Sequence, residues 1–472
     1  MKIKKALFIS TSTEIVIRLI SLTSVVFFAR LLTPDELGVF IIASSVMFVA
    51  SEFRMLGAHT YLVREEHIDS SKVGSAIGIS ILMSWGLALF LSLLSPVIAS
   101  FYGNDDLVFL ILLLSISFYS SPFTSTTSSL LSRELKFEKL FFLQTFGPVV
   151  GLVVSITLLY QGYSYEALAI GQAMQGLVDL LVSWFIRPSS MSWKPNLVHI
   201  RSIFRVGAYT SLINLVNRLG DVIPDLILGR LGTTAFVAIV SRAIGLQLFM
   251  RDILLKGVSK IALPYIAIQS REQGNLKEYF LKTTDMALVF VVPPIIAGSV
   301  ASETLIFLLF GSQWEASVPL AEWLGIWMFI KCVHYFAEPV LLAVKAESEL
   351  FWCRLAGLVG LAILLALTAE YGVTGVALSF ILSASLDFVL FTFLLKKHIQ
   401  LSFIDLVVKV KTSVLISLLL VSIAFVIREY LVSGLSNYLQ FGIYLVLLTP
   451  TWLALVHIFN HPIKKHLNLS LK

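Results

Sequence analysis

The stretch NRLGDVIPDLILGR, which runs from Asn217 to Arg230, sets Arg218, Asp221 and Asp225 around a proline in an otherwise apolar run. The apolar segment around it is long enough to cross the roughly 30 Å hydrocarbon core of a membrane as a helix. Charged side chains in such a helix are costly unless they face protein groups or water. The stretch therefore predicts a membrane span with one polar face turned away from lipid.

The composition of the whole chain agrees with this prediction. Of its 472 residues, 57% are hydrophobic and 14% are charged, against roughly 25% charged in a soluble domain, and the mean hydropathy is +0.89. A span must satisfy its own backbone hydrogen bonds, so continuous apolar runs favour helices over barrel strands. We predict an all-α integral membrane protein with about 14 transmembrane helices, near 6–29, 37–58, 74–101, 107–131, 139–160, 164–186, 205–229, 234–257, 283–310, 318–343, 350–369, 373–395, 410–427 and 437–459.

Lysine and arginine are distributed unevenly between alternate ends of these spans. Twenty-four lie on the side of both termini, whereas the other side has Arg30, Arg230 and Arg428. The positive-inside rule therefore predicts that both termini are cytoplasmic. The formal charge of +6 reflects topology and contact with anionic membrane lipids, so no nucleic acid is expected as a partner.

Several classes of site are missing from the sequence. Cys332 and Cys353 lie in apolar runs and predict packing residues. No GxxxxGK[ST] loop could cradle nucleotide phosphates, and no nucleophile–base pair or metal-ligand cluster has a recognisable spacing. We therefore expect no catalytic residue, no metal and no cofactor.

The first six spans repeat as spans seven to twelve. An ungapped shift of 200 residues places Arg18, Arg30 and Thr33 on Arg218, Arg230 and Thr233. Because six is even, both copies have the same orientation and are related by an axis along the membrane normal. The predicted domains are an N-terminal six-helix lobe (1–186), a cytoplasmic linker (187–204), a C-terminal six-helix lobe (205–395), and two additional helices with a cytoplasmic tail (396–472).

Three segments resemble signatures of the polysaccharide transporter family, a branch of the multidrug/oligosaccharidyl-lipid/polysaccharide exporter superfamily. They are RLLTPDELGVF (30–40), SRELKFEKL (132–140) and YGVTGVALS (371–379). The resemblance covers essentially the whole chain in order. The chain departs from the family at Ala238 and Val240, where the second repeat usually has a glycine and an aromatic residue.

The resemblance implies a flippase in a bacterial inner membrane. Such proteins move an undecaprenyl-diphosphate-linked oligosaccharide repeat unit from the cytoplasmic to the periplasmic leaflet by alternating access, for synthesis of surface lipopolysaccharide or exopolysaccharide. It also implies a polysaccharide polymerase and an initiating transferase as partners.

Helix geometry gathers the charges of the opening stretch on one face. At about 100° per residue, Arg218, Asp221 and Asp225 share a polar stripe, and Glu14 and Arg18 form a similar stripe on the first span. We predict that the two stripes face each other and that their arginines bind the diphosphate. Pro224 predicts a bend, which serves either as a gate or only for packing.

Other spans carry further candidate residues. Lys331 and Arg242 are predicted as additional substrate-binding cations. Coupling or gating groups are predicted at Glu14, Asp221, Asp225, Pro224, His334 and Glu338. Polar residues along the sugar path are predicted at Gln172, Gln175, Asp179, Trp327, Tyr335 and Asp387. Span ten would present its five candidates, from Trp327 to Glu338, on one helical face.

The structural alternative is that these charges pair with one another. Glu14 and Arg18, spaced i, i+4, could neutralise each other, and Lys331 could pair with a neighbouring acid. Arg54, Arg251 and Arg354 lie near predicted cytoplasmic ends, so we expect them to snorkel and exclude them.

The lack of a nucleotide site predicts a secondary transporter, with H⁺ or Na⁺ as the coupling ion. Three rivals stay open: a cation-coupled multidrug exporter of the same superfamily, a peptidoglycan-precursor lipid flippase, and a membrane enzyme acting on the same lipid carrier. The enzyme class usually needs a large periplasmic loop, and the predicted outer loops are short.

Overall fold

The computed structural model describes residues 2–54, 61, 62, 65, 67–191, 193–271 and 275–464. Side chains are described over the same ranges except for 2–8, 54, 201, 202, 204–214 and 256–271. Over the described backbone the chain is helical and contains no strand. The predicted all-α membrane fold is confirmed.

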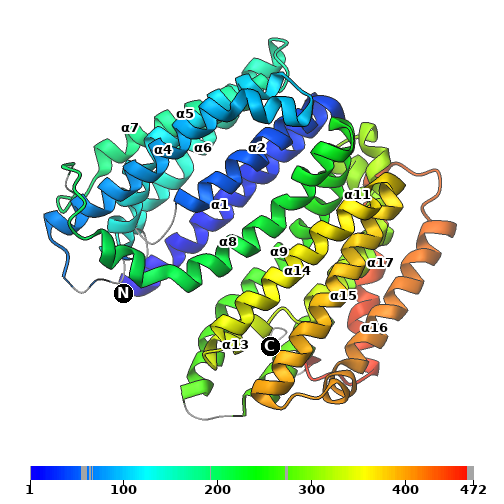
Figure 1. Cartoon of the computed structure of the whole chain (residues 1–472). Helices are drawn as coiled ribbons and strands as arrows, with labels where there is room; N and C mark the ends of the chain where they lie inside the picture. Colours follow the sequence, from blue (N-terminus) through cyan, green and yellow to red (C-terminus); the bar gives the residue numbers. More distant parts are fainter. Residues whose placement is uncertain are drawn as a thin grey trace. The chain divides into compact units, whose positions relative to one another are not determined.

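The first compact unit is Met1–Ala238. It contains α1 (Lys2–Leu31), α2 (Pro34–Arg54), α4 (Ser70–Tyr102), α5 (Asp106–Arg133), α6 (Phe137–Tyr160), α7 (Glu166–Ile186), α8 (Ile200–Leu231) and the start of α9 (Thr234–Arg271). Within it α7 packs against α6 and α5, and α8 packs against α2 and α4. Figure 1 shows these helices, coloured from blue to green, as long rods lying side by side.

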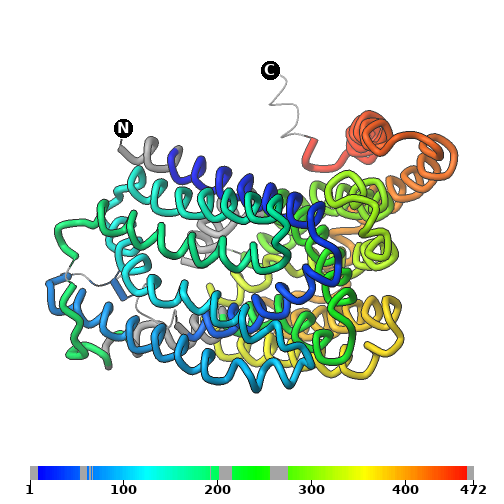
Figure 2. The backbone as a smooth tube through the Cα atoms, turned by 90° about the horizontal axis from the view of Figure 1, so that it is seen from above, coloured from blue at the N-terminus to red at the C-terminus, as the bar shows by residue number. Residues whose placement is uncertain are grey.

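The second compact unit is Ile239–Lys472. It contains the rest of α9, then α10 (Leu276–Val300), α11 (Ser302–Leu309), the 3₁₀ helix η1 (Ser312–Ser317), α12 (Val318–Val333), α13 (Ala337–Ala343), α14 (Glu347–Thr368), η2 (Ala369–Tyr371), α15 (Gly372–Ile399), α16 (Phe403–Tyr430) and α17 (Asn437–Ile458). The helix α10 packs against α12 and α16, and α15 packs against α12 and α14. The last two helices, α16 and α17, lie at one edge of this unit (Figure 2).

The fourteen predicted spans match the long helices of the described residues in order. Within the described part of the chain, ten stretches are long and apolar enough to cross a membrane, and one of them, Glu347–Ile399, holds both α14 and α15. The helices α1, α8 and α9 are also long but more polar. Large apolar side chains stay exposed on the helices, such as Phe185 at 82% and Leu93 at 71%, which suits a surface that faces lipid.

Two predicted spans are interrupted. Span 283–310 is divided into α10 and α11 at Ala301, and span 318–343 is divided into α12 and α13 by a turn at His334–Phe336. In contrast, α8 continues through Pro224. Whether Pro224 acts as a gate stays a prediction.

The boundary between the compact units falls within α9. It follows Ala238, so α8 lies in the unit that also holds the first six spans. The sequence repeat instead begins its second copy at residue 205, after the linker 187–204. The division into two six-helix lobes and two added helices stays a prediction.

Candidate functional site

The polar face of α8 lies against α2. The Nε of Arg218 is 3.9 Å from Oε1 of Glu52, and its guanidinium carbon is 5.9 Å from the centroid of the Phe48 ring. The Arg218 side chain is 56% exposed, whereas that of Glu52 is 20% exposed. Arg218 therefore lies well inside α8 with more than half of its side chain uncovered by the protein.

One to two helical turns after Arg218, the side chains of α8 change from exposed to buried. Asp221 is exposed, Pro224 is buried, and the carboxylate of Asp225 accepts a hydrogen bond from the Ser45 hydroxyl of α2 at 3.0 Å. Further along, Gly229 lies against Ile42. The two helices thus run antiparallel, and the predicted stripe lies on the face of α8 that contacts α2.

The first span contributes Glu14, which is exposed, and Arg18, which is partly buried. The helix α1 packs mainly against α6. The described partners of Arg218 come from α2, and the opposition of Arg18 and Arg218 stays a prediction.

In the second unit, Lys331 and Asp387 form an ion pair. The Nζ of Lys331 on α12 is 2.5 Å from Oδ2 of Asp387 on α15, and Asp387 is 8% exposed. A Cβ on Gly357 of α14 would lie 2.0 Å from Oδ1 of Asp387, so the carboxylate rests on the α14 backbone. This geometry matches the structural alternative for Lys331, and its role as a substrate cation stays a prediction.

A second pair joins Glu338 of α13 to Arg354 of α14. Their Oε2 and Nη2 atoms are 2.7 Å apart, and the Arg354 guanidinium carbon is 4.7 Å from the centroid of the Phe391 ring. The expectation that Arg354 snorkels is therefore wrong, because its side chain is three-quarters buried against a carboxylate and an aromatic ring. Its only sequence signal was a cation inside an apolar run.

The predicted single face of span ten does not exist, because α12 ends at Val333. His334 and Tyr335 lie in the turn that follows, and Glu338 belongs to α13. Three of the candidates nevertheless contact α15: Trp327 lies edge-on to Phe380 at 5.1 Å between centroids, Lys331 pairs with Asp387, and His334 meets Thr392 at 3.1 Å. These side chains point into the unit.

The surroundings of His334 and Arg242 are aromatic. The His334 ring is 7% exposed and lies perpendicular to Phe388 at 4.6 Å between centroids. The guanidinium carbon of Arg242 on α9 is 5.6 Å from the ring centroids of both Phe310 and Trp314. Coupling by His334 and substrate binding by Arg242 stay predictions.

On α7, Gln172 is exposed, and Gln175 and Asp179 are partly buried. Asp179 lies against Gly147 of α6. A sugar path along this face stays a prediction.

Two of the signature segments hold helix ends together. In RLLTPDELGVF, the Glu36 carboxylate accepts bonds from the backbone and hydroxyl of Thr33 at 2.8 Å and from the Ser164 hydroxyl at 2.6 Å. Asp35 accepts from the Thr234 hydroxyl at 2.8 Å and from the Ala235 N–H at 3.2 Å, which caps the start of α9.

In SRELKFEKL, Glu134 lies between α5 and α6. Burial of its carboxyl is outweighed by hydrogen bonds from Lys136 and Ser190, so the pKa of Glu134 is held below its ordinary value. The neighbouring Arg133 donates to the backbone carbonyls of Leu62 and Glu65. These signature residues fix connections and are not exposed candidates for substrate binding.

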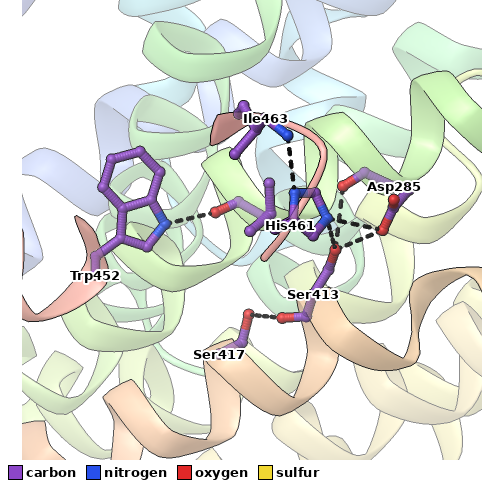
Figure 3. Close-up of polar contacts among 7 residues, drawn as sticks. Asp285, Ser413, Ser417, Trp452, His461 and Ile463 are labelled. Atoms are coloured by element: carbon purple, nitrogen blue, oxygen red, sulfur yellow. Dashed lines mark hydrogen bonds and ion pairs between the residues drawn. The ribbon is translucent and has the colours of Figure 1, made fainter. Parts of the chain in front are cut away.

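Sequence reasoning missed two buried polar groups. Gln247 on α9 is fully buried and donates from Nε2 to the Ser299 hydroxyl and to the Ala321 carbonyl, both at 2.8 Å. The other is a cluster in which His461, after α17, meets Asp285 of α10 and Ser413 of α16 (Figure 3).

The residues of the His461 cluster are hydrogen-bonded to one another. The Ser413 hydroxyl donates to Oδ1 of Asp285 at 2.6 Å, and the Ile463 N–H donates to Nδ1 of His461 at 3.3 Å. Nε2 of His461 therefore carries the proton and lies 3.2 Å from Asp285. Because Ser413 donates to the acid and not to the histidine, the three residues anchor the chain after α17 and do not form a nucleophile. A pocket of 450 Å³ lies beside them.

Among the described residues, no group of three or more His, Cys, Asp or Glu could hold a metal ion. A family model described as "Polysaccharide biosynthesis protein" matches residues 27–319, more than half of the chain. The chain belongs to this family.

Relatives within this polysaccharide biosynthesis family come from different bacteria. The chain is 26% identical to the teichuronic acid biosynthesis protein TuaB of Bacillus subtilis (strain 168) over 63% of its length and 62% of TuaB, so it spans less than two thirds of that relative. It is 20% identical to the lipopolysaccharide biosynthesis protein WzxC of Escherichia coli (strain K12), over 72% of this chain and 69% of WzxC. The succinoglycan biosynthesis transport protein ExoT of Rhizobium meliloti (strain 1021) is also 20% identical, over 69% and 66%.

Solved structures share the fold of this family member. The lipid II flippase MurJ, in an inward closed conformation, superposes with a TM-score of 0.77 at 16% identity, over 96% of this chain and 98% of MurJ. An inward-facing multidrug resistance MATE transporter of the MOP superfamily gives 0.65 at 14% identity, over 82% and 96%. These structures show a shared fold, and the polysaccharide family expected from the sequence is confirmed by the family model.

Proposed function

We propose that this protein is a flippase that moves undecaprenyl-diphosphate-linked oligosaccharide repeat units from the cytoplasmic to the periplasmic leaflet of a bacterial inner membrane. It acts by alternating access as a secondary transporter, not as an enzyme, and serves surface polysaccharide synthesis. Both termini are cytoplasmic. A polysaccharide polymerase and an initiating transferase are its proposed protein partners.

The exposure of Arg218 in the middle part of α8 is the observation that carries this proposal. Its side chain is 56% exposed well inside α8, and an arginine at membrane depth is costly when it faces acyl chains. A polar path beside α8 removes that cost. A guanidinium can bind a diphosphate with paired hydrogen bonds, so Arg218 suits an anionic head group that crosses the membrane.

The charges of the second unit support an anionic cargo as well. The acids Asp387 and Glu338 are each paired with a cation, Lys331 and Arg354. A transporter of cationic drugs would instead be expected to present unpaired acidic side chains to its cargo. The membership of the family and the names of its relatives support a glycan as the cargo's head group.

The test is transport of a fluorescent undecaprenyl-diphosphate-linked oligosaccharide in proteoliposomes. A membrane-impermeant quencher reports the fraction of lipid in the outer leaflet over time. We expect wild-type protein to flip the lipid and Arg218→Ala to lower the rate at least about tenfold, the equivalent of ~1.4 kcal/mol. Arg230→Ala is the matched control, because Arg230 is an exposed arginine at the end of the same helix.

A conservative variant tests what Arg218 contributes. Arg218→Lys rescues the rate if charge alone matters, and fails to do so if the planar guanidinium is needed.

Two further comparisons separate the rival functions. Transport of a cationic dye but not of the glycolipid would support a drug exporter. Preference for a peptidoglycan precursor over the oligosaccharide would assign the protein to precursor export. Equal rates for Arg218→Ala and wild type would refute the role of Arg218.

A further inference from the structure

The contact between α6 and α7 encloses a carboxyl group in the first unit. Glycines on both helices let the two backbones approach closely, and a Cβ on Gly151 would lie 2.8 Å from the Gly171 carbonyl oxygen. Asp179 lies two turns after Gly171 on α7. A Cβ on Gly147 of α6 would lie 1.9 Å from Oδ1 of Asp179. The carboxyl of Asp179 therefore rests directly on the α6 backbone.

Asp179 receives little polar support. The Gln175 side chain, one helical turn earlier, is the polar group placed to interact with its carboxyl. Its Oδ1 atom is buried and has no hydrogen-bond partner among the described residues. Apart from Glu166 in the first turn, Asp179 is the only charged residue in the sequence of α7.

The helices packed against α7 are α6, α5 and α2. Their charged residues lie near helix ends: Glu138 and Lys139 on α6, Asp106 and Arg133 on α5, and Asp35, Glu36, Glu52 and Arg54 on α2. The α5 groups that face Gly176, within one turn of Asp179, are Ser117 and Ser120. Arg133 donates to the Leu62 carbonyl, and Lys139 donates to the Ile186 carbonyl at the end of α7. Both acceptors lie away from the turn of α7 that carries Asp179.

The second unit contains the same arrangement with one difference. Asp387 rests on Gly357 as Asp179 rests on Gly147, and the two glycines are separated by the 210 residues that also separate Gly162 from Gly372. Asp387, however, is paired with Lys331. An ionised carboxylate without such a cation is costly in a membrane interior, and protonation removes that cost.

The surroundings favour a proton over a metal cation. A metal cation needs several oxygen ligands, whereas one carboxyl oxygen of Asp179 is covered by Gly147. A proton needs only the other oxygen. The amide of Gln175 suits both states, because it can donate to a carboxylate or accept from a carboxylic acid.

We propose that Asp179 is a proton-binding site of the first unit, a neutral acid whose hydroxyl donates to the Gln175 amide oxygen. One proton adds to the carboxylate to give the acid, and water accepts that proton when the carboxyl becomes exposed. The role assigned to Asp179 thus changes from sugar binding to proton binding. That this proton drives transport rests on the proposed function.

Infrared spectroscopy of the full-length protein in lipid tests the site without any transport assay. Protonated carboxyl groups give a carbonyl band that shifts in deuterated water. We expect one such band to disappear in Asp179→Asn and to persist in Asp387→Asn, because Asp387 is paired with Lys331. Gln175→Leu should shift the band without removing it. Identical acid bands in wild type and Asp179→Asn would overturn the proposal, and if Asp179→Asn fails to fold, an unshifted spectrum of Gln175→Leu would overturn it instead.

Transport of the fluorescent glycolipid at several pH values tests the coupling separately. We expect the wild-type rate to depend on an imposed pH gradient and the Asp179→Asn rate to lose that dependence. Retained dependence in Asp179→Asn would overturn coupling through this residue. If wild type moves no glycolipid, the proposed function fails, while the infrared result still decides whether Asp179 binds a proton.

Discussion

Lys331 and Asp387 form an ion pair between α12 and α15, with 2.5 Å between Nζ and Oδ2. The side chains are 33% and 11% exposed, so the pair lies mostly inside the second unit. It joins the interrupted span ten to the last helix of the predicted second lobe.

Lys331→Met should destabilise the second unit because it leaves the Asp387 carboxylate without its cation. Removing one partner of a buried pair costs about 3–5 kcal/mol, and the partial exposure of Lys331 places the loss near ~3 kcal/mol. Thermal unfolding of the purified protein measures it. Lys397→Met is the control, because its pair with Glu349 is 56% and 36% exposed and is worth less than about 1 kcal/mol. Equal losses in the two variants would contradict the prediction.

Gly147→Ala should also destabilise the protein, because its Cβ would overlap Oδ1 of Asp179 at 1.9 Å. Adding Asp179→Ala should restore much of the loss, with a coupling above about 1 kcal/mol in the double-mutant cycle. In the control Gly86→Ala, nothing lies within 4 Å of the new Cβ, and alanine favours a helix by up to about 1 kcal/mol. Strictly additive losses would show that the glycine and the carboxyl do not touch.

Ser413→Ala should loosen the chain after α17. The Ser413 hydroxyl donates to Asp285 at 2.6 Å, and a hydrogen bond to a charged group is worth about 1.5–3 kcal/mol. Ser417→Ala is the matched control. That buried hydroxyl of the same helix donates to the carbonyl of Ser413, its one partner among the described residues, so its loss should cost below about 1 kcal/mol. Unfolding midpoints compare the two serines, and a larger effect at Ser417 would argue against the cluster.

Gln247→Leu should reduce the amount of folded protein. The substitution leaves the buried Ala321 carbonyl and Ser299 hydroxyl without the donor they share, at about 1–3 kcal/mol. Gln172→Leu, at an exposed position of α7, should change stability by less than about 0.5 kcal/mol. Membrane abundance and unfolding of each variant provide the measurement. A stable Gln247→Leu protein would mean that these groups find other partners.

The sequence by itself determined the class of the protein and the order of its spans. A membrane helix satisfies its backbone within one stretch of about 20 apolar residues, so each span could be recognised locally. The helical period also placed Trp327 and Lys331 on a face of α12 that meets α15. The signature segments added the polysaccharide family, which the family model confirms.

Only the tertiary structure decided which partner each polar group has. Lys331 and Asp387 are 56 residues apart, and His461 and Asp285 are 176 apart, and no local pattern links such positions. The turn that ends α12 at Val333 was likewise not predicted, because the stretch Ser312–Ala343 is long and apolar enough to pass as one span. Pairing depends on which helices pack together and on how far each is rotated, and those quantities arise from contacts between distant segments.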